Sequence, residues 1–208
     1  MMDKVSTNKT DFFREPAHFD FLNQHVFPKY AKANGTFRPL KIWSSACSSG
    51  EEVYSIAITI EEYNQRHCAF NYSIAGTDIS NEILKKAING VYPHGAIKDI
   101  PLHLREKYFL RSKDRSLEKV RIVPKIRQKT AFSRLNLMRP YYGEDQKYDV
   151  IFCRNVMIYF NKKTQEEVLK KQCSTLRKGG YFFLGHSESI TGMKAPLKQV
   201  YPTIYQKL

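Results

Sequence analysis

The spacing of apolar and polar residues predicts alternating strands and helices in the first half of the chain. Residues 40–46 (LKIWSSA) are a short apolar run that ends in small side chains, which is typical of a buried strand before a tight turn. Residues 51–65 carry apolar side chains at the i, i+3, i+4, i+7 spacing of a helix. A second strand is predicted over residues 70–80, and the next helix is expected to begin after a Ser80 cap and to end at Gly90.

The second half contains a third strand and helix. Residues 148–155 (YDVIFCRN) begin as a continuous apolar run, which is typical of a strand that is covered on both faces. A helix is predicted over residues 162–180, ended by two glycines, and a strand over residues 181–189. Residues 200–208 are predicted to be a last strand, for which an antiparallel direction is allowed. This alternation predicts an α/β fold with a doubly wound, mostly parallel sheet.

The middle of the chain interrupts this alternation. Three short strand-like pieces, KYFLRS, EKVRIVP and KTAFSRLNL, are separated by charged turns, and no long helix is predicted among them. We therefore expect a small antiparallel β-rich insertion over residues 92 to about 130, within one domain that spans residues 1–208.

The charge of the chain indicates an acidic partner. The 34 Lys and Arg residues exceed the 20 Asp and Glu residues, for a formal charge of +14. Between His94 and Arg139, thirteen basic residues face four acidic ones, so +9 of this charge lies in one segment. Nucleic acid, anionic lipid or an acidic protein surface would each suit such a segment. Alternatively, the segment is only a solvated surface without a partner.

Cysteine and histidine spacing favours a cytoplasmic protein without a metal site. The four cysteines form no C-x-x-C pair and the six histidines no H-x-x-x-H pair. No apolar run approaches the roughly 18 residues of a membrane span, and the first ten residues lack the apolar centre of a signal peptide. We expect no membrane insertion.

The turn after the first predicted strand, SSACSSGEE, favours a cationic ligand. Small residues such as Ala46 and Gly50 let the backbone approach a ligand, although the full G-x-G-x-x-G pattern is absent. Glu51 and Glu52 place two negative charges where a pyrophosphate would need bare N–H groups. S-adenosylmethionine carries a sulfonium, an ammonium and a ribose but no phosphate, and Asp78 at the end of the second strand could accept hydrogen bonds from the ribose. Alternatively, the glutamates only complement the helix dipole, and Asp78 is a turn residue.

A polar pair stands where a buried strand should end. In IFCRNVMIYF (151–160), Arg154 and Asn155 follow the apolar run, and Tyr159 lies shortly beyond them. Buried polar groups without partners cost roughly 1–3 kcal/mol each, so we expect a ligand or a partner group at this place.

Six stretches, taken in order, resemble one family, the chemotaxis receptor glutamate O-methyltransferases of the CheR type. They are TNKTDFFRE (7–15), WSSACSSGEEVYSIA (43–57), GTDIS (76–80), RLNL (134–137), FCRNVMIYF (152–160) and GGYFFLGHSES (179–189). The resemblance implies a Rossmann-like methyltransferase fold. It also implies methylation of glutamate side chains on the cytoplasmic helices of bacterial chemoreceptors, with S-adenosylhomocysteine as the product.

The resemblance also implies roles for individual residues. The cofactor-binding set is Asn8, Thr10, Arg14, Ala46, Gly50, Glu51, Asp78, Asn136, Leu137, Arg154 and Asn155. In this set, Arg14 would face the cofactor carboxylate, Glu51 its methionine part and Asp78 its ribose. Asn136 and Leu137 would flank the adenine. Arg154 and Tyr159 are the candidate catalytic residues, where methyl donor and acceptor meet.

The sequence departs from the family pattern at its beginning. Members usually carry a basic helical domain before the FFR stretch, whereas about eleven residues precede Phe12 here, so we expect that domain to be absent. Val53 stands where the family usually has a proline. The first turn of a helix tolerates this change, because proline is only favoured there. The expected partner is a chemoreceptor cytoplasmic domain, with the protein acting as a monomer.

Two other functions remain open. A nucleic-acid methyltransferase would suit the positive charge, but RNVMIY lacks the proline of an N-P-P-Y pocket, and no aromatic RNA-binding platform is evident. We therefore expect no nucleic-acid partner. A non-catalytic adaptor that binds the cofactor as a sensor would keep the same residues.

Overall fold

The computed structural model describes residues 10–32, 38–142 and 147–208. Its main sheet has seven strands in the order β6-β2-β1-β7-β8-β10-β9. Their bounds are β1 (Leu40–Ser44), β2 (Tyr72–Asp78), β6 (Thr130–Arg134), β7 (Tyr148–Cys153), β8 (Leu176–Leu184), β9 (Leu197–Tyr201) and β10 (Ile204–Lys207). The first five are parallel, and β10 pairs antiparallel with β8 and β9. This confirms the predicted mostly parallel α/β fold.

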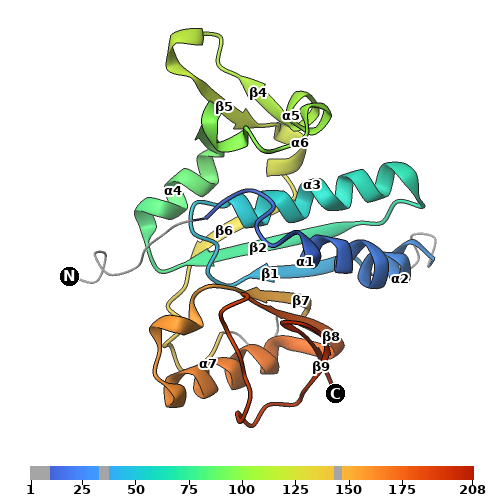
Figure 1. Cartoon of the computed structure of the whole chain (residues 1–208), viewed down its shortest axis with the longest axis vertical. Coiled ribbons are helices and arrows are strands. Elements are labelled where there is room, and N and C mark those ends of the chain that lie inside the picture. Colours follow the sequence, from blue (N-terminus) through green and yellow to red (C-terminus); the bar gives the residue numbers. More distant parts are fainter. Residues whose placement is uncertain (1–9, 33–37, 143–146) are drawn as a thin grey trace.

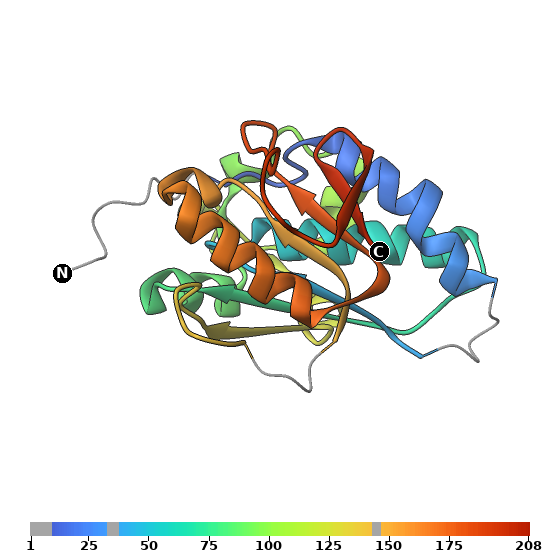
Figure 2. The same cartoon turned by 90° about the horizontal axis from the view of Figure 1, so that it is seen from below.

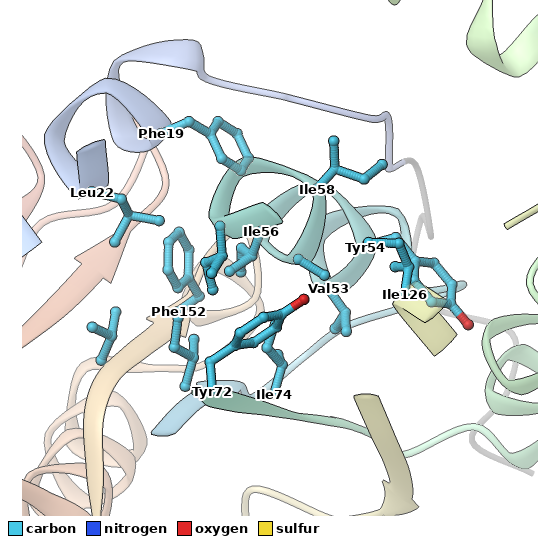
Figure 3. Close-up of a cluster of buried hydrophobic side chains, with 14 of the residues drawn as sticks. Phe19, Leu22, Val53, Tyr54, Ile56, Ile58, Tyr72, Ile74, Ile126 and Phe152 are labelled. Carbon is cyan, nitrogen blue, oxygen red and sulfur yellow. The ribbon is translucent and has the colours of Figure 1, made fainter. Parts of the chain in front are cut away.

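Helices cover both faces of this sheet (Figures 1 and 2). They are α1 (Pro16–Phe21), α2 (Phe27–Ala31), α3 (Glu51–Arg66), α4 (Asn81–Asn89) and α7 (Lys162–Thr175). Alternate residues of each strand point to opposite faces. Accordingly, Ile42 and Phe152 join the core under α1 and α3, which Figure 3 shows in part, whereas Trp43 and Ile151 join the core under α7. A sheet buried on both faces explains the continuous apolar run in β7.

The predicted starts of α3 and α4 and the predicted end of α4 are confirmed. Helix α3 begins at Glu51, after Gly50 in the left-handed region with φ 97°. The Ser80 hydroxyl accepts a hydrogen bond from Ile83 N and caps α4, and Gly90 ends that helix with φ 61°.

A nearly continuous helix at residues 16–31 was not predicted. A π-helical segment, η1 (Leu22–Val26), joins α1 to α2 and comes directly before Phe27 and Pro28. Proline has no N–H and its ring crowds the preceding turn, so a wider turn lets the helix continue past it.

The insertion forms a small sheet of its own, beyond the end of α4 (Figure 1). Its elements are β3 (Val91–Pro93), η2 (His94–Ile97), α5 (Leu102–Tyr108), β4 (Phe109–Arg111), η3 (Arg115–Leu117), β5 (Lys119–Ile122) and α6 (Pro124–Arg127). The three strands pair antiparallel, as predicted for the insertion, and their order is β3-β5-β4. The third strand-like piece does not belong with them, because β6 pairs parallel with β2 at the edge of the main sheet.

Two predictions near the C-terminus are wrong. Helix α7 ends at Thr175, and Gly179 and Gly180 lie inside β8. A Cβ on Gly180 would lie 2.8 Å from the Asp149 carbonyl oxygen, so this glycine permits close approach to β7. The C-terminal segment forms a hairpin of β9 and β10, not one strand. Within the described ranges, no helix is long and apolar enough to cross a membrane.

Candidate active site

A cavity of about 680 Å³ lies at the carboxyl ends of the strands, where the strand order reverses between β1 and β7. Most of its lining residues fall into three groups. The strand-end wall comprises residues 45–48, 78, 79 and 135–138, which follow β1, β2 and β6. The β7 wall comprises Arg154, Asn155, Val156, Tyr159 and Phe160, which follow β7. Thr10, Asp11 and Arg14 approach from the N-terminal segment. Ligands of doubly wound sheets bind at this position.

Main-chain hydrogen bonds hold the strand-end wall. Cys47 N donates to the Thr77 carbonyl oxygen at 2.9 Å, and Ser48 N donates to Asp78 Oδ2 at 2.9 Å. Asp78 Oδ1 accepts from Ser80 N at 3.0 Å. The Asp78 carboxylate is thereby oriented at the cavity with acceptor capacity left, since a carboxylate has about four lone-pair sites.

Close packing explains Gly50. It has φ 97°, and a Cβ there would lie 3.0 Å from Ala87 Cβ of α4. The turn between β1 and α3 can therefore lie against α4 only with glycine at this position.

The two glutamates that begin α3 differ in their surroundings. Ser49 Oγ donates to both carboxylate oxygens of Glu51, and burial raises the pKa of Glu51 to about 7. Glu52 lines the cavity and accepts from Ser44 Oγ at 2.7 Å. Burial raises the pKa of Glu52, and the charge of Arg154 opposes that shift.

Arg154 is buried within an ionic cluster. Its Nη1 contacts Glu52 Oε2 at 3.0 Å, and its Nη2 contacts Glu15 Oε2 at 3.0 Å. Nη2 also donates to the Arg14 carbonyl oxygen at 2.7 Å, and Nε donates to Glu15 Oε2 at 3.3 Å. The cluster ties the N-terminal segment to the β7 wall and to the first turn of α3, and two carboxylates around one guanidinium suit a cationic ligand. These contacts are the partner groups expected for Arg154 after β7.

The backbone of the N-terminal segment is unusual around these contacts. Phe13 and Glu15 have φ values of 54° and 61°, which are uncommon for residues other than glycine. Phe13 N donates to Ser55 Oγ at 2.9 Å, and the ring of Phe12 packs edge-on against Tyr92 and Phe109. Packing and the Arg154 cluster together hold this conformation next to the cavity.

Most of the predicted site residues meet at this cavity. Those that line it are Thr10, Arg14, Ala46, Asp78, Asn136, Leu137, Arg154, Asn155 and Tyr159. Gly50 and Glu51 are not among the lining residues, and Asn8 lies outside the described part of the chain. Their contacts with a cofactor stay predictions, as do those of the lining residues.

Sequence reasoning missed the residues that hold the site together. Glu15 pairs with Arg154 across 139 positions, and no local pattern indicates such a pair. The sequence indicates a negative charge at Glu52 but not its contact with Arg154. Because α3 is buried on nearly all sides, its apolar pattern does not tell which of two successive glutamates faces the cavity. The described residues contain no group of three or more His, Cys, Asp or Glu that could hold a metal ion.

Comparison with known proteins identifies the family. A family model described as "CheR methyltransferase, SAM binding domain" matches residues 8–205. The chain belongs to the CheR methyltransferase family. The chemotaxis protein methyltransferase of Borreliella burgdorferi is 41% identical over 210 residues, which cover 100% of this chain and 73% of that protein. Chemotaxis protein methyltransferase 2 of Pseudomonas aeruginosa is 38% identical, over 98% of this chain and 71% of that protein. The Escherichia coli chemotaxis protein methyltransferase is 34% identical, over 98% and 68% respectively.

These matches confirm the predicted family, fold and cofactor. The chain is an S-adenosylmethionine-dependent methyltransferase, and its cavity has the chemistry that this cofactor needs. Asp78 places at the cavity a carboxylate, which is a group that accepts hydrogen bonds from hydroxyls, and the Glu15–Arg154–Glu52 cluster carries two carboxylates for one guanidinium beside the same space. When bound, S-adenosylmethionine would supply the methyl group.

Proposed function

We propose that this CheR family member transfers methyl groups to glutamate side chains on the cytoplasmic helices of chemoreceptors. The products would be glutamate methyl esters and S-adenosylhomocysteine. The observation that carries the proposal is the cavity itself, because one wall offers groups for an adenosyl cofactor and the other ends in an exposed tyrosine at the entrance. The names of the relatives support the link with chemotaxis.

The proposed reaction does not require a general base. A glutamate carboxylate, with a reference pKa near 4.3, is already ionised at neutral pH and can attack as it stands. The task of the protein is to hold the acceptor oxygen in line with the methyl carbon, and such placement can supply roughly 7–11 kcal/mol of the barrier.

Arg154 and Tyr159 would contribute in different ways. The Arg154 nitrogens already donate to Glu15, Glu52 and a carbonyl oxygen, so we propose that Arg154 organises the charges around the reacting atoms. Tyr159 lines the cavity with 47% of its surface exposed, which leaves its hydroxyl free to meet an incoming side chain. We therefore favour Tyr159 as the residue that contacts the acceptor.

The basic insertion is the proposed docking region for the receptor. Lys113, Lys119 and Arg121 are exposed on and beside β5, and receptor helices that present glutamates would be attracted to them. We propose that the protein acts as a monomer in the cytoplasm, where those helices lie.

Methyl transfer to a receptor fragment tests this function. Purified protein would be incubated with methyl-tritiated S-adenosylmethionine and a chemoreceptor cytoplasmic fragment, with bulk RNA as the parallel acceptor. We expect label on the fragment, released as volatile methanol by alkali, as a methyl ester requires. Label on RNA would favour a nucleic-acid methyltransferase, and cofactor binding without any transfer would favour an adaptor.

A conservative variant at the cavity entrance tests the role of Tyr159. We expect Tyr159→Phe to lower kcat about tenfold, since the loss of one hydrogen bond to a charged acceptor costs about 1.5–3 kcal/mol. The matched control is Tyr141→Phe, because Tyr141 is 64% exposed and does not line the cavity. Equal activity of the two variants would remove Tyr159 from the mechanism.

A further inference from the structure

One buried carboxylate holds the β7 wall by its backbone. Glu188 is 7% exposed, and its two oxygens accept four main-chain N–H groups. Oε2 accepts from Asn155 N and Gly185 N, each at 2.8 Å. Oε1 accepts from Val156 N at 2.8 Å and Met157 N at 2.7 Å. All four distances are those of strong charge-assisted hydrogen bonds.

These bonds join two loops that follow neighbouring strands. Asn155, Val156 and Met157 follow β7, and Gly185 follows β8. Asn155 has φ 58°, in the left-handed region, so its main-chain conformation needs support from its surroundings. The 3-10 turn η4 (Met157–Tyr159) begins within the held segment, and it carries Tyr159 to the cavity entrance.

The loops also fit closely against each other on the Gly185 side. A Cβ on Gly185 would lie 2.6 Å from Asn155 Nδ2 and 3.0 Å from Asn155 N. The Asn155 position is thus determined from two directions, by the Glu188 carboxylate and by the absence of a side chain at Gly185.

We propose that Glu188 is a positioning residue that sets the β7 wall for methyl transfer. The inference rests on the proposed function. Among the described residues, the Glu188 carboxylate accepts hydrogen bonds only from the loops after β7 and β8, whereas the hydrogen bonds of the strand-end wall run through Thr77 and Asp78. The loss of Glu188 should therefore lower turnover much more than cofactor affinity, because misplacement of about 1 Å far from the chemistry can cost about 100-fold in rate.

Glu188→Gln is the most informative variant. It keeps the size of the side chain, but its amide group offers one oxygen and one NH₂ group. In either orientation the NH₂ group would face two N–H donors, so half of the four hydrogen bonds would be lost. Gly185→Ala disturbs Asn155 from the other side and leaves the Glu188 carboxylate intact. Ser187→Ala is the control, because Ser187 is the exposed neighbour of Glu188.

The experiment compares kcat for the receptor fragment with the calorimetric Kd for S-adenosylhomocysteine. We expect Glu188→Gln and Gly185→Ala to lower kcat 10- to 100-fold and to change Kd less than threefold, with Ser187→Ala like wild type. Wild-type kcat in both variants would overturn the proposal. Parallel losses of kcat and affinity would also overturn it, because they indicate a general loss of structure.

Amide NMR tests the positioning without any assay of activity. Hydrogen bonds to a carboxylate shift amide protons downfield, so we expect Asn155, Val156, Met157 and Gly185 to move upfield in Glu188→Gln. Amides of Cys47 and Ser48 should stay in place. Unchanged resonances at all four positions would contradict the positioning role of Glu188, whether or not the wild type transfers methyl groups. A wild type that transfers no methyl groups would refute the proposed function instead.

Discussion

The two walls of the cavity are built by different means. The strand-end wall is held by bonds between segments that adjoin neighbouring strands, such as Ser48 N to Asp78 Oδ2. The β7 wall is held by carboxylates around Arg154 and the main chain after it: Glu15 and Glu52 come from distant parts of the chain, and Glu188 comes from the loop after the neighbouring strand β8. We propose that the first wall binds the adenosyl part of the cofactor and that the second one places the acceptor.

The largest effect is expected from breaking the ionic cluster of the β7 wall. Arg154→Met leaves Glu15 and Glu52 without their cation. Removal of one partner of a buried ion pair costs about 3–5 kcal/mol, and we expect that loss in the free energy of unfolding by urea. Arg139→Met, at an exposed position, should change it by less than about 0.5 kcal/mol. Equal stability of the two variants would show that the cluster does not hold the wall.

A substitution in the strand-end wall should act on affinity instead. Asp78→Asn removes the charge from the proposed ribose acceptor, and a hydrogen bond to a charged group contributes about 1.5–3 kcal/mol. We expect the Kd for S-adenosylhomocysteine to rise 10- to 100-fold by calorimetry, with kcat within threefold of wild type at saturating cofactor. An unchanged Kd would exclude Asp78 from cofactor binding.

The dependence of activity on salt concentration should distinguish the docking of the receptor from the roles of the two cavity walls. A rise from 50 to 500 mM NaCl is expected to lower kcat/KM for the receptor fragment about tenfold, because screening weakens attraction between exposed charges. The charge reversals Lys113→Glu and Lys119→Glu should reduce this dependence. The matched reversals Lys162→Glu and Lys163→Glu, exposed at the start of α7, should leave it intact. A salt effect that both pairs reduce equally would indicate a response to net charge alone.

The smallest expected effect is the pH dependence of cofactor binding. Burial raises the pKa of Glu51 to about 7, so this carboxyl is protonated below that pH and becomes negative above it. The sulfonium keeps its positive charge throughout, and affinity for S-adenosylmethionine should therefore rise about threefold from pH 6 to pH 8. Glu51→Gln should abolish the rise. The same rise in Glu51→Gln would assign it to another group.

The contrast between the walls also explains what could be predicted from sequence. Strand and helix periodicity, the Ser80 cap and the Gly90 end are local features, and they correctly predict that Asp78 ends a strand and that Ala46 lies in the turn before a helix. Arg154 was expected at the cavity because a polar residue after a buried strand needs a partner. Its partners could not be identified, since pairing across 139 positions depends on the completed fold.

Other incorrect predictions also concern features that depend on the completed fold. The end of α7 depends on how closely Gly180 approaches Asp149 of β7, which is a tertiary contact. The strand β6 is short and half-buried, so its apolar pattern alone did not distinguish the edge of the main sheet from the insertion. Glu188 falls within the strand predicted over residues 181–189, whereas β8 ends at Leu184, and only the fold brings the four N–H groups to its carboxylate.

The most direct test of the division between the walls is one set of saturation curves for wild type, Asp78→Asn and Glu188→Gln, with S-adenosylmethionine varied at a constant, saturating receptor fragment. We expect opposite behaviour of the two variants: Asp78→Asn should need at least tenfold more cofactor yet reach nearly the wild-type kcat. Glu188→Gln should saturate at the wild-type concentration with a kcat at least tenfold lower. Curves in which both variants lose affinity and kcat together would contradict it.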